Sequence, residues 1–488
     1  MVGKKKLYLI GMDSAPLWII KELYKNHGMK GFETFFNEGI LKDMKSTLPP
    51  LTPTAWPSIY TGLEPREHGV MDFFCVGRGY EKSVPRFDAE ANPPFWDLAA
   101  DRGLRSLVVT PPMVLKPSSR SNVDMITGWP LPPKFSSDEL KSTAVKFGFE
   151  GEPPIEKGIQ EGRIRVDEAS RRYVASIKSR SEMSKHLIES KDYDIVFVCF
   201  TETDRIQHYS LNKPDWERNV APLYKSISDF LEWVIGYTRS KNEQSLVMLV
   251  SDHGAQPIHS KFLLNAWLIN NGYATLKPEA VEQHERTAPE AKASASNLAQ
   301  GGLPALAKRF ASKFMSGVSS SESKNEYTRI HDSDFEMDKT SAFTSISNNP
   351  VGMIWINDDR FSKPIMQRKD RKNLKMEIME KLDKLKTEDD EKLVTAVYDG
   401  DEYYGKTKRF IAPDILFAVR DGYIVDVKDY SSTRAFMPPE LTKSGDHTMN
   451  GIFGVVAKNC VVDKSANEDR DVYGVKPMIM GFLDLLQE

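Results

Sequence analysis

Three short fragments, far apart in this chain, each pair a carboxylate with an imidazole. They are Asp204-Arg205-Ile206-Gln207-His208, Asp252-His253-Gly254 and Asp446-His447-Thr448. A fourth fragment, Gly11-Met12-Asp13-Ser14, adds a carboxylate directly after an apolar run. The side chains that offer nitrogen or oxygen ligands are Asp13, Asp204, His208, Asp252, His253 and His447. Such a set can hold two divalent metals side by side, and a metal pair can clamp the attacking and leaving oxygens of a phosphoryl transfer.

Each fragment, taken alone, also has an ordinary structural explanation. Asp204 and His208 are four residues apart, which on a helix puts both side chains on one face. A helix-start acid and an unrelated surface histidine would give the same spacing. Asp252 and Gly254 are also residue types that are common in a turn ending a strand. The metal hypothesis therefore depends on where the fold places these fragments relative to one another.

Short apolar runs alternate with helical segments over the first half of the chain. The runs, read as buried strands, are Leu7–Ile10, Leu107–Val109, Ile195–Val198 and Leu246–Val250. The helical segments are Arg165–Ser190, which is charged and free of Gly and Pro, and Pro214–Tyr237, with Pro at its expected first turn. This alternation predicts an α/β three-layer sandwich, in which helices flank a central, mostly parallel sheet.

The predicted sheet places three of the acids together. Ligand sites in such sheets lie beyond the carboxyl ends of the strands, which is where Asp13, Asp204 and Asp252 fall. Later segments fit the same architecture: they are the strands Met353–Ile356, Ile415–Val419 and Ile452–Val456 and the amphipathic helix Gln367–Lys386.

A nucleophile has to come from another part of the chain. The stretch from Leu48 to Ser58 is dense in hydroxyl side chains and in Pro. A hydroxyl at a helix N-terminus beside a metal can ionise and accept a phosphoryl group, although Thr and Ser are favoured at helix starts in any case. From the residues alone, the choice stays open among Thr52, Thr54 and Ser58.

The order of these motifs resembles the alkaline phosphatase superfamily. It is most similar to the type I phosphodiesterase/nucleotide pyrophosphatase group, especially its prokaryotic members of unassigned substrate. The matching motifs are the strand that ends in Gly11-x-Asp13, Thr61-Gly-x-x-Pro-x-x-His-Gly69, Asp204-x-x-x-His208, Ser251-Asp-His-Gly254 and Gly445-x-His447. The resemblance covers nearly the whole chain and implies an alkaline phosphatase-like fold with an inserted cap or flap.

The resemblance also implies roles for individual residues. One metal would be bound by Asp13, Thr52, Asp252 and His253, and the other by Asp204, His208 and His447. Thr52 would be the nucleophile, with Thr54 as the runner-up. Mixed imidazole and carboxylate ligands favour zinc, with manganese or iron as alternatives. The expected activity is hydrolysis of a small phosphodiester, such as a nucleotide or nucleotide-sugar, through a phosphothreonine intermediate.

Several other activities are compatible with the same residues. A phosphomutase or phosphotransferase would pass the phosphoryl group to an alcohol, and a phosphonate or sulfate ester hydrolase would use a related substrate. The sulfatase signature, a Cys or Ser before x-Pro-x-Arg, is not evident. A non-catalytic binding protein on this fold is the least favoured alternative, because it would not need the complete ligand set.

Composition limits the partners and the compartment. The net charge of −3, without a stripe of basic and aromatic residues, argues against a polymeric nucleic acid partner. The three cysteines are too scattered for a disulfide framework, and Cys199 is expected to be a small core residue. The apolar run after the basic start is too short for a signal peptide or membrane span, so the cytoplasm is the expected location. The sequence predicts no oligomeric state.

One stretch differs from the rest of the chain. Residues 1–275 and 330–488 are expected to form the catalytic core, with 276–329 as an insertion. Within it, Ala291–Ser321 has no acidic residue and carries four basic ones, Lys292, Lys308, Arg309 and Lys313. It is either a disordered insertion or a flap that closes on an anionic substrate or touches a membrane interface. Three aromatic residues near the hydroxyl stretch could wall the substrate site or simply pack in the core: Trp56, Phe73 and Phe74.

Overall fold

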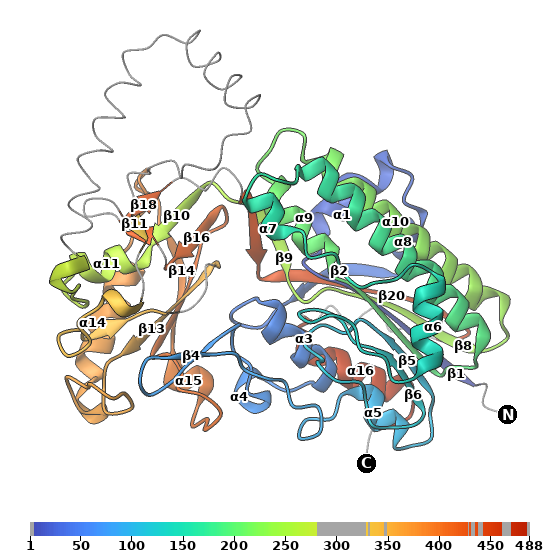
Figure 1. The fold of residues 1–488 in the computed structure, drawn as a ribbon, viewed down its shortest axis with the longest axis horizontal. Helices are drawn as coiled ribbons and strands as arrows, with labels where there is room; N and C mark the ends of the chain where they lie inside the picture. Colours follow the sequence, from blue (N-terminus) through green and yellow to red (C-terminus); the bar gives the residue numbers. More distant parts are fainter. Residues whose placement is uncertain are drawn as a thin grey trace, which may run out of the picture.

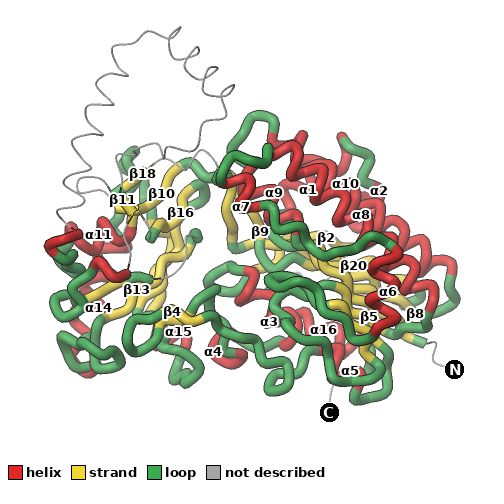
Figure 2. The backbone as a smooth tube through the Cα atoms, in the orientation of Figure 1, coloured by secondary structure: helices red, strands yellow, loops and turns green. Residues whose placement is uncertain are grey.

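The computed structural model of the chain has two lobes, each built around its own β-sheet (Figures 1 and 2). It describes residues 4–280, 328–329, 332–345, 349–427, 429–430, 435–437, 443–460 and 470–485. The predicted flap Ala291–Ser321 lies outside these residues, as do His284 and His331. The role of that segment and the boundaries of the insertion therefore stay predictions.

The central sheet of the larger lobe has seven strands, in the order β2-β20-β8-β1-β7-β5-β6. The strands β8, β1, β7, β5 and β6 run parallel to one another, and at one edge β20 pairs antiparallel with both β8 and β2. Their bounds are β1 Lys5–Met12, β2 Ile40–Lys45, β5 Ser106–Val109, β6 Val123–Ile126, β7 Ile195–Phe200, β8 Gln244–Val250 and β20 Asn450–Lys458. The predicted α/β sandwich with a mostly parallel sheet is confirmed.

Helices cover both faces of this sheet, because its strands are apolar on both sides (Figure 1). The helices against one face are α1 Leu17–Asn26, α2 Lys30–Asn37, α6 Asp138–Lys146, α8 Val166–Ser190 and α10 Trp216–Ser240. Those against the other are α3 Thr52–Thr61, α5 Phe95–Ala100 and α16 Val475–Phe482. The second of the two predicted long helices begins at Trp216, so Pro214 lies in the turn before it and not in its first turn.

The smaller lobe is built around a separate four-stranded antiparallel sheet, in the order β12-β13-β15-β14. Its main elements are β10 Ser260–Leu263, α11 Leu264–Asn270, β12 Ala342–Phe343, β13 Val351–Ile356, α14 Lys372–Asp383, β14 Val394–Asp399, β15 Ile415–Val419, β16 Tyr423–Asp426 and β18 Phe436–Met437. The predicted strands at Met353–Ile356 and Ile415–Val419 are present, but they form this second sheet. Their apolar residues pack against α14 in a core of their own, which includes Ile354, Phe417 and Ile378.

A short antiparallel ribbon links the lobes. It pairs β9 Gly254–Pro257 with β19 Gly445–Thr448, and Ala255 lies opposite His447. Almost the entire smaller lobe is therefore formed by the part of the chain between β9 and β19. The remaining elements are α4 Pro65–His68, β3 Cys75–Val76, β4 Lys82–Ser83, α7 Glu156–Gln160, α9 Glu202–Ser210, β11 Thr328–Arg329, α15 Gly400–Tyr404 and β17 Asp429–Tyr430.

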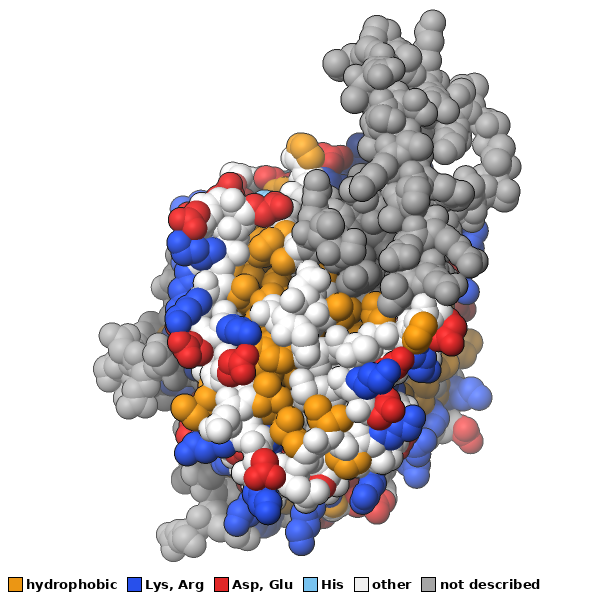
Figure 3. All heavy atoms as spheres, turned by 90° about the vertical axis from the view of Figure 1, so that its left-hand side faces the viewer, with side chains coloured by type: hydrophobic (Ala, Val, Ile, Leu, Met, Phe, Trp, Pro, Cys, Tyr) orange, Lys and Arg blue, Asp and Glu red, His pale blue; other side chains and the backbone are white. Residues whose placement is uncertain are grey.

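The surface of the smaller lobe mixes charges of both signs. Hydrophobic side chains run over the middle of its outer face, and acidic and basic side chains stand side by side around the edge (Figure 3). None of the helices in the described ranges combines the length and the apolarity needed to span a membrane.

Candidate metal centre

The predicted ligands meet where three neighbouring strands end. Asp13 follows β1 and Asp252 follows β8, while Asp204 lies on α9, directly after β7. Because β8, β1 and β7 are parallel neighbours, their carboxyl ends lie together at one edge of the sheet. The ribbon brings His447 to the same place, and His253 follows Asp252 in the turn before β9. The centre is buried: Asp13, Asp252 and His253 have no exposed surface.

One half of the centre gathers around Asp13. Its carboxylate Oδ1 lies 3.8 Å from His253 Nε2, which is itself 3.1 Å from Asp252 Oδ2. Thr52, the first residue of α3, places its Oγ1 3.3 Å from Asp13 Oδ1 and 3.3 Å from His253 Nε2. Ligand atoms of Asp13, Asp252 and His253 all lie within 4.8 Å of one another, close enough to share one ion.

The other half gathers around Asp204. Its Oδ1 lies 3.3 Å from His208 Nε2 and 3.3 Å from His447 Nε2. The rings of His253 and His447 are 4.0 Å apart, centroid to centroid, so the two halves touch. Asp204, His253 and His447 form a second group whose ligand atoms lie within 4.8 Å. The geometry thus permits two ions with ligands at the boundary between them.

Two of the imidazoles are oriented by backbone carbonyls. The Nδ1 of His208 lies 2.8 Å from Gly445 O, and the Nδ1 of His253 lies 3.1 Å from Gly254 O. When Nδ1–H donates to a carbonyl, the Nε2 lone pair is left for a metal. Gly445 has to be a glycine for this approach, because a Cβ there would lie 2.4 Å from Gln207 O.

Burial and mutual repulsion disturb the protonation of the acids. Burial, reinforced by repulsion from Asp252, raises the pKa of Asp13 well above its ordinary value. Burial also raises the pKa of Asp252 to about 7. Burial alone would raise the pKa of Asp204 too, but its attraction to His208 and Arg205 holds this pKa well below the usual range. In the Asp13 half, burial and repulsion therefore favour protonated carboxyl groups, and a bound cation would replace these protons and stabilise the ionised forms.

Two of the three imidazoles have pKa values shifted in the direction that suits a metal ligand, whereas burial of His208 is outweighed by its attraction to Asp204, which raises the pKa of His208. Burial lowers the pKa of His253 to about 4, and burial together with repulsion from His253 lowers the pKa of His447 to about 4. Both rings are consequently neutral near pH 7, as metal ligation requires. Several buried ligand atoms have no hydrogen bond, namely Asp204 Oδ1, Asp252 Oδ2 and both ring nitrogens of His447. A donor set of this chemistry, with its lone pairs unused, fits two divalent cations.

Among the three candidate hydroxyls, Thr52 is the one that contacts the predicted ligands. Ser58 Oγ instead donates to Thr54 O at 3.3 Å and lies 3.0 Å from His68 Nε2. Thr54 Oγ1 is buried and has no hydrogen-bond partner. Of the three hydroxyls, that of Thr52 is therefore the one placed beside Asp13 and His253.

Two polar residues near the centre were not predicted. Asp446 lies within ligand distance of His208 and His447, but one of its oxygens accepts from His447 N and the other pairs with Lys443. Arg205 Nη1 donates to Asp204 Oδ2 at 2.9 Å. Both flank predicted ligands in the sequence, and this adjacency is the signal that could have identified them.

The aromatic residues near Thr52 have different environments. Trp56 is fully buried in the core and donates its indole N–H to Asp13 Oδ2 at 3.1 Å, so it supports a ligand from behind. Phe73 packs edge-on against Trp129, whereas Phe74 is 41% exposed. Cys199 is fully buried, as predicted. Across the described ranges, no cluster of potential ligands includes the other described histidines, which are His27, His68, His186 and His259.

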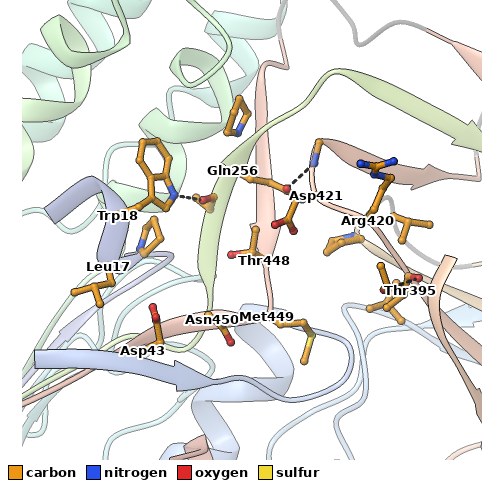
Figure 4. A pocket seen from close by; sticks show the side chains of 18 of the residues that line it. Leu17, Trp18, Asp43, Gln256, Thr395, Arg420, Asp421, Thr448, Met449 and Asn450 are labelled. Carbon is orange, nitrogen blue, oxygen red and sulfur yellow. Dashed lines mark hydrogen bonds between the residues drawn. The ribbon is translucent and has the colours of Figure 1, made fainter. Parts of the chain in front are cut away.

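A cavity of about 910 Å³ lies between the lobes, behind the ribbon (Figure 4). Trp18 and Asp43 line it from the larger lobe and Arg420 from the smaller one, but none of the predicted ligands does. Gln256 lines it and bonds to both lobes: its Nε2 donates to His447 O at 3.3 Å. Its Oε1 accepts from Gly422 N at 2.7 Å (Figure 4). The smaller lobe is thereby tied to the strand that carries His447.

A protein-family model decides the classification. The model described as "Type I phosphodiesterase / nucleotide pyrophosphatase" matches residues 7–451, which is most of the chain. The chain belongs to this family. The type I phosphodiesterase / nucleotide pyrophosphatase family is part of the alkaline phosphatase superfamily and consists of metal-dependent phosphoester hydrolases, so the resemblance drawn from the motifs is confirmed. No curated protein matches the chain in sequence.

Solved structures of two other proteins are similar to this chain in fold. Phosphonoacetate hydrolase from Sinorhizobium meliloti 1021, in complex with phosphonoacetate, matches with a TM-score of 0.59 at 12% identity, over 99% of this chain and 96% of that one. Its complex with phosphonoformate matches with a TM-score of 0.57 at 13% identity, over the same shares. Murine ectonucleotide pyrophosphatase / phosphodiesterase 5 matches with a TM-score of 0.51 at 12% identity, over 99% and 95%. At these identities the matches show the fold alone.

Proposed function

We propose that the protein is a two-metal phosphodiesterase that uses Thr52 as its nucleophile. The observation that carries this proposal is the position of Thr52 Oγ1, 3.3 Å from both Asp13 and His253 at the N-terminus of α3. The ions would be held by Asp13, Asp252 and His253 on one side and by Asp204, His208 and His447 on the other, and we favour zinc. When bound, they would supply positive charge to the phosphoryl group and lower the pKa of nearby hydroxyls.

The proposed reaction has two displacement steps, in which individual residues have separate roles. Thr52 Oγ attacks phosphorus, the alcohol leaves with a proton, and a phosphothreonine remains. Water hydrolyses this ester on the opposite side and regenerates Thr52. Thr52 is the first residue of α3, so it lies at the positive end of the helix dipole, which favours the negative charge that develops there. Trp56 keeps Asp13 oriented during both steps through its hydrogen bond.

The nucleophile is tested by comparing two threonines on the same helix. Thr52→Ala should abolish turnover while two metals stay bound, since Thr52 supplies at most one ligand. Thr54→Ala is the matched control: the Thr54 hydroxyl is buried and makes no hydrogen bond to a predicted ligand, so activity should stay within a few-fold of the unaltered protein. The reverse ranking in a steady-state assay, with metal content measured on the same samples, would move the assignment to Thr54.

The substrate class is tested with paired substrates on zinc-loaded protein. We expect an aryl phosphodiester to be hydrolysed faster than the corresponding monoester, and faster hydrolysis of the monoester would overturn the assignment. Phosphonate hydrolysis is the second candidate, because a protein with this fold has been solved with phosphonoacetate bound. Phosphonoacetate therefore belongs in the same assay, with released phosphate as the readout. Transfer of the phosphoryl group to an added alcohol would instead indicate a phosphotransferase.

A further inference from the structure

Arg205 connects a predicted metal ligand to acids on a different segment of the chain. Its Nη1 donates to Asp204 Oδ2 at 2.9 Å, and its Nε donates to Glu152 Oε1 at 2.8 Å. The same Nε lies 3.1 Å from Glu156 Oε1 at the start of α7. The guanidinium carbon is 4.6 Å from the centre of the Trp129 ring, which is stacking distance. Four residues therefore fix the plane of this guanidinium.

The two carboxylate oxygens of Asp204 have different surroundings. Oδ2 is occupied by Arg205, while Oδ1 has no hydrogen bond and lies 3.3 Å from both His208 Nε2 and His447 Nε2. A carboxylate that is free to rotate could present either oxygen to an ion. With Arg205 in place, the oxygen that faces the two imidazoles is Oδ1.

The side chains of Arg205 and of its partner Glu152 are both largely buried. Its side chain is 12% exposed and that of Glu152 is 8% exposed. The other oxygen of Glu152 accepts from the hydroxyl of Thr201, the residue before α9. Arginine can serve two acids at once because its donors form a rigid planar fork, which the single ammonium of lysine cannot reproduce. The contacts thus tie the start of α9 to the loop that carries Glu152.

We propose that Arg205 is a positioning residue, which turns Asp204 so that Oδ1 faces the ion shared with His208 and His447. Glu152 and Trp129 hold Arg205 in the orientation that this role needs. The inference rests on the proposed two-metal function. It makes the affinity of one of the two ions depend on a residue that offers no ligand atom of its own, as partners of ligating carboxylates commonly do.

The smaller lobe supplies a matched control. Arg360 is 13% exposed and contacts two buried acids, Asp358 and Asp414, which belong to none of the candidate ligand groups in the described ranges. Replacing either arginine by methionine keeps the aliphatic stem and removes the charge. In a zinc titration against a chromophoric chelator, R205M should bind one of two zinc ions about 10–100-fold more weakly and the other unchanged. R360M should bind both ions as the unaltered protein does.

A lysine variant and added zinc separate positioning from folding. R205K should recover part of the lost affinity, because one ammonium can still reach Asp204 but not Glu152 as well. Excess zinc should restore turnover of R205M on the aryl diester, which a misfolded site would not permit. E152Q provides an independent variant if R205M does not fold, and it should weaken the same ion by a smaller factor.

The outcomes discriminate between the two proposals. Two zinc ions with unchanged affinities in R205M and in E152Q would overturn the positioning role and leave the proposed function intact. Equal weakening by R205M and R360M would also overturn it, because the effect would then be one of general stability. Fewer than two zinc ions in the unaltered protein would instead defeat the proposed function itself.

Discussion

The two lobes both bury aspartates, but they compensate the buried charge in different ways. In the smaller lobe, Asp358 and Asp414 are almost fully buried, and both contact Arg360 and Arg371. In the metal centre, Asp13 and Asp252 are equally buried, yet within the described ranges neither is paired with a lysine or an arginine. The ring of His253 lies 3.8 Å from Asp13 and 3.1 Å from Asp252, but it is neutral near pH 7.

This difference separates a structural charge cluster from a binding site. Removing charges from water is costly, and the cost is recovered only when they are paired. The smaller lobe supplies its own counter-charges, Arg360 and Arg371. The metal centre has acids in excess, and an external cation would complete it. Burial alone would not have distinguished the two clusters, whereas the balance of charge does.

The largest expected effect comes from removing an acid of the metal centre. Asp252→Ala should remove a ligand and with it several kcal/mol of transition-state stabilisation, which corresponds to a loss of at least about a thousandfold in kcat. Elemental analysis of the same sample should show less than two metals per chain. Full activity with full metal content would show that Asp252 is not a metal ligand, and the proposed difference between the lobes would be wrong.

A substitution in the smaller lobe should lower stability without changing metal content or activity. Asp414→Asn leaves Arg360 and Arg371 with a missing counter-charge and should lower the free energy of unfolding by roughly 3 kcal/mol. Metal content and kcat at 25 °C should not change. Urea unfolding measures the stability, and a loss of metal in this variant would show that the lobes are not independent.

Chelation should destabilise the protein without any substitution. If each ion is present at about 100 times its dissociation constant, removing it lowers the free energy of unfolding by about 2.7 kcal/mol per site. Thermal unfolding with and without a chelator measures this shift. Asp252→Ala, which has already lost ligation, should respond less to the chelator than Asp414→Asn, and an equal response would contradict the assignment of Asp252.

The smallest effect concerns a buried histidine on the nucleophile side of the larger lobe. Val70 N donates to His68 Nδ1 at 3.2 Å, and burial lowers the pKa of His68 to about 3. The unfolded chain binds a proton below about pH 6.5 and the folded one does not, so His68 contributes stability above pH 6.5 that is lost on acidification. Between pH 6.5 and 3 the loss is about 1.4 kcal/mol per pH unit.

The control for this effect is a variant without the titrating ring. His68→Gln can be compared with the unaltered protein by urea unfolding at pH 7 and pH 5. Between pH 7 and pH 5, the free energy of unfolding of the unaltered protein should fall by roughly 2 kcal/mol more than that of the variant. Parallel curves would show that His68 is not held neutral by burial.

Sequence patterns predicted the central sheet because its strands are uniformly apolar runs, and the acids at their ends followed from the parallel arrangement. They did not predict that Met353–Ile356 and Ile415–Val419 form a second sheet, since an apolar run does not specify its partner strand. The roles of Asp446 and Arg205 were also missed. Their contacts depend on side-chain directions at α9 and β19, and residue type and spacing do not determine these directions.

The ribbon that joins the lobes has a consequence for how the protein is made. Asp13 and His447 are separated by 434 positions along the chain (447 − 13). A ribosome that adds roughly 5–20 residues per second delivers the last imidazole about 20–90 s after the first acid. During that interval the nascent chain carries the acids but not the full set of neutral nitrogen ligands. A chain that is released before His447 therefore lacks one of the three ligands of the Asp204 half. We expect tight binding of both ions only in molecules whose synthesis has passed His447.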